Sequence, residues 1–297
     1  MGAPAHAVIG PWPALAAARA HDAAKRMPFV VSDAQAPPLQ AGSLARTDIT
    51  ALRRWPRWLQ VDKQQVTLIA PAAERAAAFA TMNRALRDDG LIVAWRDEPF
   101  PLFDVNGRAL GVSIERAATR FWGTLTLGAH CNGYVADARG HPMQLWIARR
   151  APTKATDPNR LDNLIGGGVP AGQSPRDTVI REGWEEAGLS PEQMRGLQRG
   201  RVLRLLRDIP EGLQREWIHV YDLALPAGAT PRNQDGEVAE LTLHELADAL
   251  ALASSSEMTV DAALVTLDFA LRRGLFDAPT QAALGAAAAD LLAGVAA

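Results

Sequence analysis

The stretch of sequence that decides the fold is Gly166–Leu189, which reads GGGVPAGQSPRDTVIREGWEEAGL. It contains a glycine-rich start, a helix with clear start signals and a glycine stop. Ser174 is expected to cap the helix, because Pro175 follows at the first helical position and Asp177 stands three residues after the cap. Gly188 can adopt the left-handed conformation that ends many helices. The stretch therefore predicts a glycine-rich loop followed by one short helix.

Three glutamates share one face of this predicted helix. At 100° per residue, Glu182, Glu185 and Glu186 fall within an arc of about 100°. We expect them to point outward, while a face with Trp184 and Ala187 packs against the protein. Like charges at these spacings repel, and a cation bound between them would remove the repulsion. Carboxylate oxygens suit Mg²⁺ or Mn²⁺. The face is therefore either a divalent-cation site or a solvated acidic surface.

Features before the helix are compatible with binding a phosphate. Gly167 and Gly168 would let the backbone approach a phosphate group closely. Arg149, Arg150 and Lys154 cluster ahead of the glycines. They are either solvated loop charges or ligands of a diphosphate, which arginine holds by bidentate hydrogen bonds. The sequence leaves both readings of this basic cluster open.

The stretch resembles the Nudix box, whose pattern is G-x5-E-x7-R-E-U-x-E-E-x-G-U, where U is a bulky aliphatic residue. Two positions depart from the pattern, because Gln173 stands in place of the first glutamate and Gly183 in place of the first U. The other fixed positions match and are occupied by Gly167, Arg181, Glu182, Glu185, Glu186, Gly188 and Leu189. The resemblance implies a cation-dependent hydrolase of a diphosphate linkage.

The resemblance also implies roles for individual residues. Glu185 and Glu186 would be the main ligands of Mg²⁺ or Mn²⁺, and Glu182 would share in ligation and in activating water. Arg181 would form an ion pair that holds a glutamate in place. Glu237, which follows a turn glycine, is either a general base from a neighbouring loop or a surface acid at a turn. The metal would bridge phosphate oxygens and lower the pKa of a bound water.

Similarity to one Nudix branch extends beyond the box. That branch carries an extra N-terminal domain, is fused to thiamine pyrophosphokinase in some yeasts and often lacks the first box glutamate. The segments that carry this similarity are Trp95–Glu98, Ile114–Ala118, His130–Tyr134, Trp146–Arg150, Leu161–Asn163, Asp222–Pro226 and Asp235–Val238.

The branch implies a particular substrate. It implies hydrolysis of a thiamine-diphosphate-like compound, including an oxidised or damaged form, to the monophosphate and phosphate. Arg149 and Lys154 would then hold the terminal phosphate. Two alternatives remain open at this point. One is a Nudix hydrolase of a nucleoside diphosphate derivative or another diphosphate, and the other is a catalytically silent Nudix-like module that binds a ligand or partner.

The composition of the chain is that of a soluble globular protein. Of its 297 residues, 48% are hydrophobic and 22% charged, and the net charge of −2 gives no general affinity for nucleic acid or anionic membranes. The single cysteine, Cys131, excludes an internal disulfide and fits a reducing cytoplasm. No apolar run reaches the length of a membrane helix. We expect a cytoplasmic protein that binds a small molecule, and a homodimer would be a common assembly.

The expected fold is a Nudix α/β/α sandwich with a mixed sheet at residues 124–297, preceded by a smaller α+β domain at residues 1–123. Strands are expected at Val66–Ile69, Leu91–Trp95, Pro99–Val105, Leu125–Tyr134, Met143–Ala148, Arg201–Arg207 and Glu216–Leu225. Helices are expected at Ala14–Arg26, Ala72–Arg87, Leu241–Leu252, Thr259–Arg273 and Thr280–Val295, with a further helix starting within Ile114–Thr119.

Overall fold

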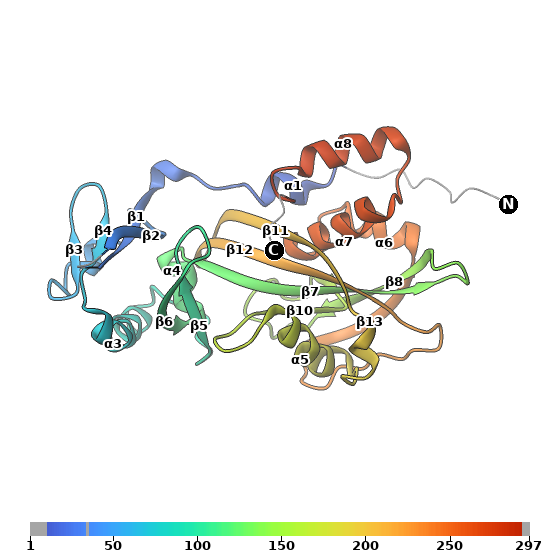
Figure 1. Ribbon diagram of the computed structural model, residues 1–297, viewed down its shortest axis with the longest axis horizontal. Coiled ribbons are helices and arrows are strands. Elements are labelled where there is room, and N and C mark those ends of the chain that lie inside the picture. Colours follow the sequence, from blue (N-terminus) through green and yellow to red (C-terminus); the bar gives the residue numbers. More distant parts are fainter. Residues whose placement is uncertain (1–10, 34–35, 293–297) are drawn as a thin grey trace.

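The computed structural model describes residues 11–33 and 36–292, which form two parts that lie side by side (Figure 1). The N-terminal part contains a four-stranded sheet with the order β2-β1-β4-β3, in which β1 and β4 run parallel. A two-stranded hairpin, β5–β6, and three helices complete it. The bounds are β1 Arg26–Asp33, β2 Ala36–Ala45, α2 Ile49–Leu52, β3 Leu59–Val61, β4 Val66–Leu68, α3 Arg75–Asp88, β5 Pro99–Phe103, β6 Ala109–Glu115 and α4 Arg116–Trp122.

The C-terminal part is built on a seven-stranded mixed sheet. Its main path is β11-β12-β7-β8-β13, while β10 pairs with β7 and β9 pairs with β8. The sheet is mixed because β12 runs parallel to β7 and the other pairs are antiparallel. The strands are β7 Leu125–Ala136, β8 Pro142–Arg150, β9 Leu161–Asn163, β10 Ile165–Gly168, β11 Gln198–Ile209, β12 Gly212–Ala224 and β13 Val238–Glu245.

Helices cover both faces of this sheet, as Figure 1 shows. On one face, α5 packs against β10 and β7. On the other face, α7 contacts β7, β9, β11 and β12, and α1, α6 and α8 pack against α7. The helix bounds are α1 Pro13–Ala17, α5 Pro175–Ala187, α6 Leu246–Ala253, α7 Val260–Arg273 and α8 Ala278–Ala288. The expected α/β/α sandwich, preceded by a small α+β part, is confirmed.

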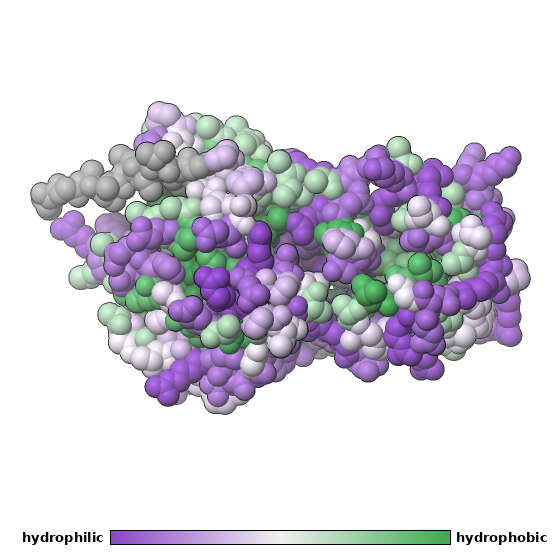
Figure 2. All heavy atoms as spheres, turned by 180° about the vertical axis from the view of Figure 1, so that it is seen from behind, coloured by the Kyte–Doolittle hydropathy of each residue, from purple (hydrophilic) through white to green (hydrophobic). Residues whose placement is uncertain are grey.

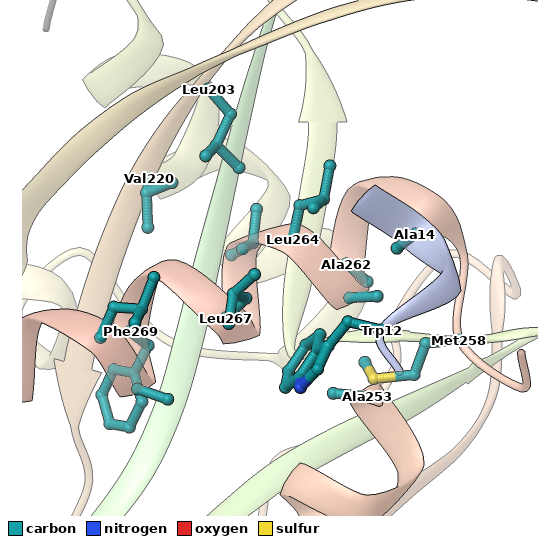
Figure 3. Close-up of a cluster of buried hydrophobic side chains, with 14 of the residues drawn as sticks. Trp12, Ala14, Leu203, Val220, Ala253, Met258, Ala262, Leu264, Leu267 and Phe269 are labelled. Atoms are coloured by element: carbon teal, nitrogen blue, oxygen red, sulfur yellow. The ribbon is translucent and has the colours of Figure 1, made fainter. Parts of the chain in front are cut away.

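The apolar side of α7 forms the centre of one core. Leu264, Leu267 and Phe269 are buried there among residues of the sheet and of α6. Figure 3 shows Trp12 and Ala14, which lie just before and within α1, beside this helix. Trp12 is 1% exposed and contacts Phe276 edge to face. The first described residues therefore complete the core of the C-terminal part, although the N-terminal sheet follows them in sequence.

The predicted helix at Ala14–Arg26 was wrong beyond Ala17. Residues 20–25 are exposed and have no apolar face to bury, and Arg26 already belongs to β1. A second predicted helix, Leu241–Leu252, was wrong in its first half. Residues 238–245 form the edge strand β13, whose alternation the helical reading missed, and α6 begins only at Leu246.

The predicted strand Leu91–Trp95 is a loop. Ala94 has a left-handed φ of 59° and Asp97 a φ of 57°, which is incompatible with an extended strand. Ile92 is nevertheless buried, which explains the apolar character of the segment. The helix expected to start within Ile114–Thr119 begins at Arg116, where β6 ends.

The two parts of the chain contact each other through α4 and β2, which pack against β12. Cys131 is buried in the core beneath α5. No helix in residues 11–33 and 36–292 is long and apolar enough to cross a membrane. The face seen in Figure 2 is largely hydrophilic, with hydrophobic residues in separate patches.

Candidate active site

Helix α5 has the predicted start and stop. The Ser174 side chain accepts a hydrogen bond from the Asp177 backbone N–H, and the Asp177 carboxylate accepts one from the Ser174 backbone N–H. Gly188 follows the helix with a left-handed φ of 64°. Residues 165–168, predicted as a loop, instead form strand β10, which pairs with β7. This pairing fixes the backbone on which α5 packs.

The helix is rotated from the orientation that the sequence suggested. Trp184 is 53% exposed, whereas Glu186 is only 6% exposed, so the expectation of outward-pointing glutamates was wrong. Gly183, which stands where the Nudix pattern has a bulky residue, lies on the buried side of the helix. An added Cβ there would lie 2.8 Å from Met194 Cε and 3.2 Å from Ile165 Cδ1. The missing side chain lets the glutamate face approach the sheet closely.

Two glutamates of α5 lie against the glycines of β10. Glu186 Oε2 accepts a hydrogen bond from the Gly166 backbone N–H at 2.8 Å. The Glu182 carboxylate occupies the space above Gly167, where a Cβ would be 2.2 Å from Glu182 Oε1. Gly167 is thus required because any side chain would displace the carboxylate. The glycines were predicted to let the backbone approach a phosphate. In the structure they bring the carboxylates of Glu182 and Glu186 close to the backbone.

Burial raises the pKa of both carboxyl groups. Burial, followed by the charge of Glu182, raises the pKa of Glu186 to about 8. The pKa of Glu182 is also raised, again mainly by burial, although Arg181 opposes the increase. Two buried carboxyl groups with raised pKa values on adjacent turns are typical of a site that binds a cation or handles protons.

Arg181 contacts two of the glutamates of α5. Its Nη2 donates to Glu182 Oε1 at 2.7 Å, and its Nη1 donates to Glu185 Oε2 at 2.5 Å. Its Nε donates to Gln173 Oε1 at 3.3 Å. Gln173 therefore keeps a contact to the arginine, although it lacks the charge of the glutamate in the Nudix pattern.

Lys154 and Glu237 meet beside Glu186. Lys154 Nζ forms an ion pair with Glu237 Oε2, and Arg96 Nη1 lies 3.5 Å from Glu237 Oε1. Lys154, Glu186, Glu237, Arg150 and Asp162 line one small cavity. Burial lowers the pKa of Lys154, while the negative charge of Glu186 partly offsets this by raising it. Residues that lie more than 80 positions apart in sequence are thus brought together.

Arg149 and Arg150 point to different surroundings, because adjacent residues of a strand alternate in direction. Arg150 pairs with the buried Asp162 at 2.7 Å and lines the cavity with Glu186. Arg149 instead donates to the Asn159 carbonyl, lies 3.8 Å from Glu240 and is not among the residues lining that cavity. Of the two arginines, the structure brings Arg150 to the glutamates.

Two arginines of the N-terminal part, Arg96 and Arg116, also lie near these glutamates, although no motif in the sequence predicted a role for them. Arg116 pairs with Glu98 at 2.9 Å, and its guanidinium carbon would be 3.5 Å from a Cβ on Gly168. The charge of Arg116 lowers the pKa of Glu182, and the charge of Glu182 raises the pKa of Arg96. Both arginines lie within segments that carry the resemblance to the Nudix branch, Trp95–Glu98 and Ile114–Ala118. Their position within these segments is the sequence signal from which a role for Arg96 and Arg116 could have been predicted.

The three glutamates of α5 are chemically suited to bind a divalent cation. Glu182, Glu185 and Glu186 offer only oxygen, the ligand atom that Mg²⁺ prefers. The unfavourable charge of two buried carboxylates would be relieved by a cation. Within the described residues, however, no three acidic, histidine or cysteine side chains are already arranged to hold a metal, since Arg181 occupies Glu182 and Glu185. If all three glutamates bound the cation, Glu182 and Glu185 would have to give up their ion pairs with Arg181.

Comparison with known proteins shows what the segment that carries this site is similar to. Residues 129–262 match the NUDIX domain, a match that includes the whole of β10 and α5. Over these residues the chain is similar to Nudix proteins. Residues 14–126 match a domain described as "Domain of unknown function (DUF4743)". The order of a DUF4743 domain followed by a Nudix domain agrees with the expected extra N-terminal domain.

The Nudix relatives cover most of this chain but not their own full length. "Nudix hydrolase 20, chloroplastic" and "Nudix hydrolase 24, chloroplastic" of Arabidopsis thaliana are 36% and 35% identical over 204 and 205 residues, each alignment covering 68% of this chain. "Uncharacterized protein YJR142W" of Saccharomyces cerevisiae is 32% identical over 195 residues, or 62% of this chain. The alignments span 54%, 55% and 56% of these three relatives, about half of each.

Proposed function

We propose that this protein is a divalent-cation-dependent Nudix hydrolase of a diphosphate linkage. The observation that carries the proposal is the pair of the partly buried Glu182 and the buried Glu186, which lies on β10 with Arg181 on one side and Lys154 on the other. A purely structural helix face does not require two carboxyl groups whose pKa values are raised by burial. The relatives named Nudix hydrolase support the same reaction class.

In the proposed reaction, water attacks a diphosphate phosphorus. Glu182, Glu185 and Glu186 would hold Mg²⁺ or Mn²⁺, which neutralises phosphate charge and lowers the pKa of bound water. Arg181 positions Glu182 and Glu185 through its two ion pairs. Glu237 is a candidate base or proton carrier, because it lies in the same small cavity as Glu186.

The proposed substrate is a thiamine-diphosphate-like compound, including an oxidised or damaged form, which would give the monophosphate and phosphate. This choice rests on the similarity to the Nudix branch with an extra N-terminal domain, and the DUF4743 match supports the presence of such a domain. A cytoplasmic location, a homodimeric state and a domain boundary near residue 123 belong to the same proposal. A single buried cysteine is compatible with a reducing compartment.

Two other functions remain as alternatives. The first is hydrolysis of a nucleoside diphosphate derivative by the same glutamates. The second is a silent Nudix-like module, which the glutamine at position 173 favours. Against the silent module, Gln173 still contacts Arg181, and Arg181 still contacts both Glu182 and Glu185. The internal connections of the box are therefore retained.

The test is phosphate release by the purified protein in Mg²⁺. Thiamine diphosphate and its oxidised analogues are compared with ADP-ribose, NADH and nucleoside triphosphates. We expect preference for the thiamine compounds. Preference for a nucleotide would retain the reaction and replace the substrate, whereas no turnover of any compound would favour the silent module.

A further inference from the structure

A cavity of about 250 Å³ lies between the two parts of the molecule. Its walls come from the segment at residues 93–96, helix α4, the loop at residues 155–157, the β11–β12 hairpin and the start of α7. Small-molecule sites occur preferentially at such interfaces between domains. The charged side chains in its walls are the four arginines Arg96, Arg116, Arg120 and Arg207 and the three acids Asp157, Glu211 and Asp261.

The four arginines give the cavity the chemistry of an anion site. Arg116 pairs with Glu98 at 2.9 Å and Arg120 with Glu216 at 3.0 Å. Among the described residues, Arg120 Nη1 and Arg207 Nε are buried nitrogen atoms for which the structure provides no hydrogen-bond acceptor. Buried donors are normally satisfied, so these guanidinium groups have donors available for a ligand. Guanidinium groups bind phosphates by paired, charge-assisted hydrogen bonds.

Two arginines of the cavity also lie near the groups that surround the glutamates of α5. Arg96 lines the cavity and also lies 3.5 Å from Glu237, which shares the small cavity beside Glu186. Arg116 lines the cavity and lies against Gly168. The two arginines therefore stand between the cavity and the carboxylates. A ligand within the cavity can present a phosphate to both at once.

The loops on two sides of the cavity have a strained backbone. Ala94 and Asp97 have φ values of 59° and 57°, and Asp157 and Asn159 have φ values of 47° and 62°. In the described part of the chain, the only other non-glycine residue with positive φ is Trp12. Residues in this region cost free energy and cluster at ligand-binding sites. The strain thus coincides with the arginine-lined walls.

We propose that this cavity is the substrate site, and that the N-terminal part supplies Arg96 and Arg116 as the side chains that bind the diphosphate. The inference rests on the proposed function and extends it to named residues outside the Nudix domain. The ligand class is a phosphorylated small molecule whose diphosphate lies between the two arginines and the glutamates of α5. Arg120 and Arg207 line the more distant part of the site.

The test measures binding of methylenediphosphonate, a diphosphate analogue that is not hydrolysed, to the full chain in Mg²⁺ by calorimetry. We expect Arg96→Gln and Arg116→Gln each to weaken binding by at least about tenfold, because each removes a charge-assisted contact. With a hydrolysed diphosphate, KM should rise at least tenfold, and kcat should change much less. Arg54→Gln is the matched control, since Arg54 also pairs with a carboxylate and lies over an aromatic ring, but away from the cavity.

The outcomes separate this inference from the proposed function. Unchanged binding and KM in both variants would overturn the inference, even if turnover still depends on Glu186. Loss of binding in both variants, with no turnover of any diphosphate by the wild type, would support the inference and reject the proposed function. A lower Tm with unchanged affinity of the folded protein would assign Arg96 and Arg116 to holding the two parts together, which also overturns the inference.

Discussion

The substitution Glu186→Gln should stabilise the metal-free protein at high pH while abolishing its activity. Glutamine retains the shape of the side chain and an oxygen that accepts the hydrogen bond from Gly166 N–H. It removes a negative charge that is 6% exposed and lies close to Glu182 and Asp162. The carboxylate is therefore costly to the folded state unless a cation is bound beside it.

The magnitude follows from the raised pKa. Between about pH 4.5 and about pH 8, the folded protein holds a proton on Glu186 that the unfolded chain has released. Stability contributed by this group is therefore complete below pH 4.5 and is lost as the pH rises to about 8. The difference between these pKa values corresponds to about 5 kcal/mol. Relaxation of the carboxylate toward water reduces this cost, and we expect at least about 2 kcal/mol at pH 9.

The assay compares thermal unfolding of wild type and Glu186→Gln in EDTA from pH 5 to pH 9. The two Tm values should be similar at pH 5, and the variant should exceed the wild type by at least about 3 °C at pH 9. Mg²⁺ should raise the Tm of the wild type at pH 9 but not that of the variant. A variant that is less stable than the wild type at every pH in EDTA would refute the reasoning.

Three further substitutions test other contacts of the site. Arg181→Ala should lower the rate of phosphate release, or the affinity for Mg²⁺, by about 10- to 100-fold, because it frees Glu182 and Glu185; an unchanged Mg²⁺ titration would contradict this. Gln173→Glu should change kcat by less than about threefold, since the glutamine oxygen already contacts Arg181; a tenfold increase would mean that the missing charge limits the reaction. Gly183→Val should lower the free energy of unfolding in urea by about 1–3 kcal/mol through contact with Met194, whereas the exposed control Trp184→Ser should stay within about 0.5 kcal/mol.

The local signals in the sequence predicted the local structure well. Ser174, Asp177 and Gly188 act through backbone geometry over a few residues. The residues at each end of the helix are therefore enough to predict where it begins or ends. The order of most strands and helices in the C-terminal part followed from their periodicity in the same way. The edge strand β13 was misread because Leu243 near its end and Leu246 and Leu250 in α6 are three and four residues apart, so the strand end and the helix together fit one helical spacing.

The direction in which the glutamates point could not be predicted from their spacing. Three charged residues on one face normally indicate the solvent side, and the buried position of Glu186 arises only from tertiary contacts with Gly166 and the cavity around Lys154. The ion pairs of Glu237 with Lys154 and Arg96 likewise connect distant segments. Such contacts depend on tertiary packing within the C-terminal part and, for Arg96, between the two parts, which no local pattern encodes.

The most direct test of the central claim is the dependence of phosphate release on Mg²⁺ in wild type and Glu186→Gln, measured with the best diphosphate substrate at pH 8. The account predicts turnover by the wild type that disappears in EDTA and returns with added Mg²⁺. It also predicts a rate at least about 100-fold lower for the variant, although the variant remains folded. Equal rates for the two proteins, or a wild-type rate that does not change when Mg²⁺ is removed, would contradict the account.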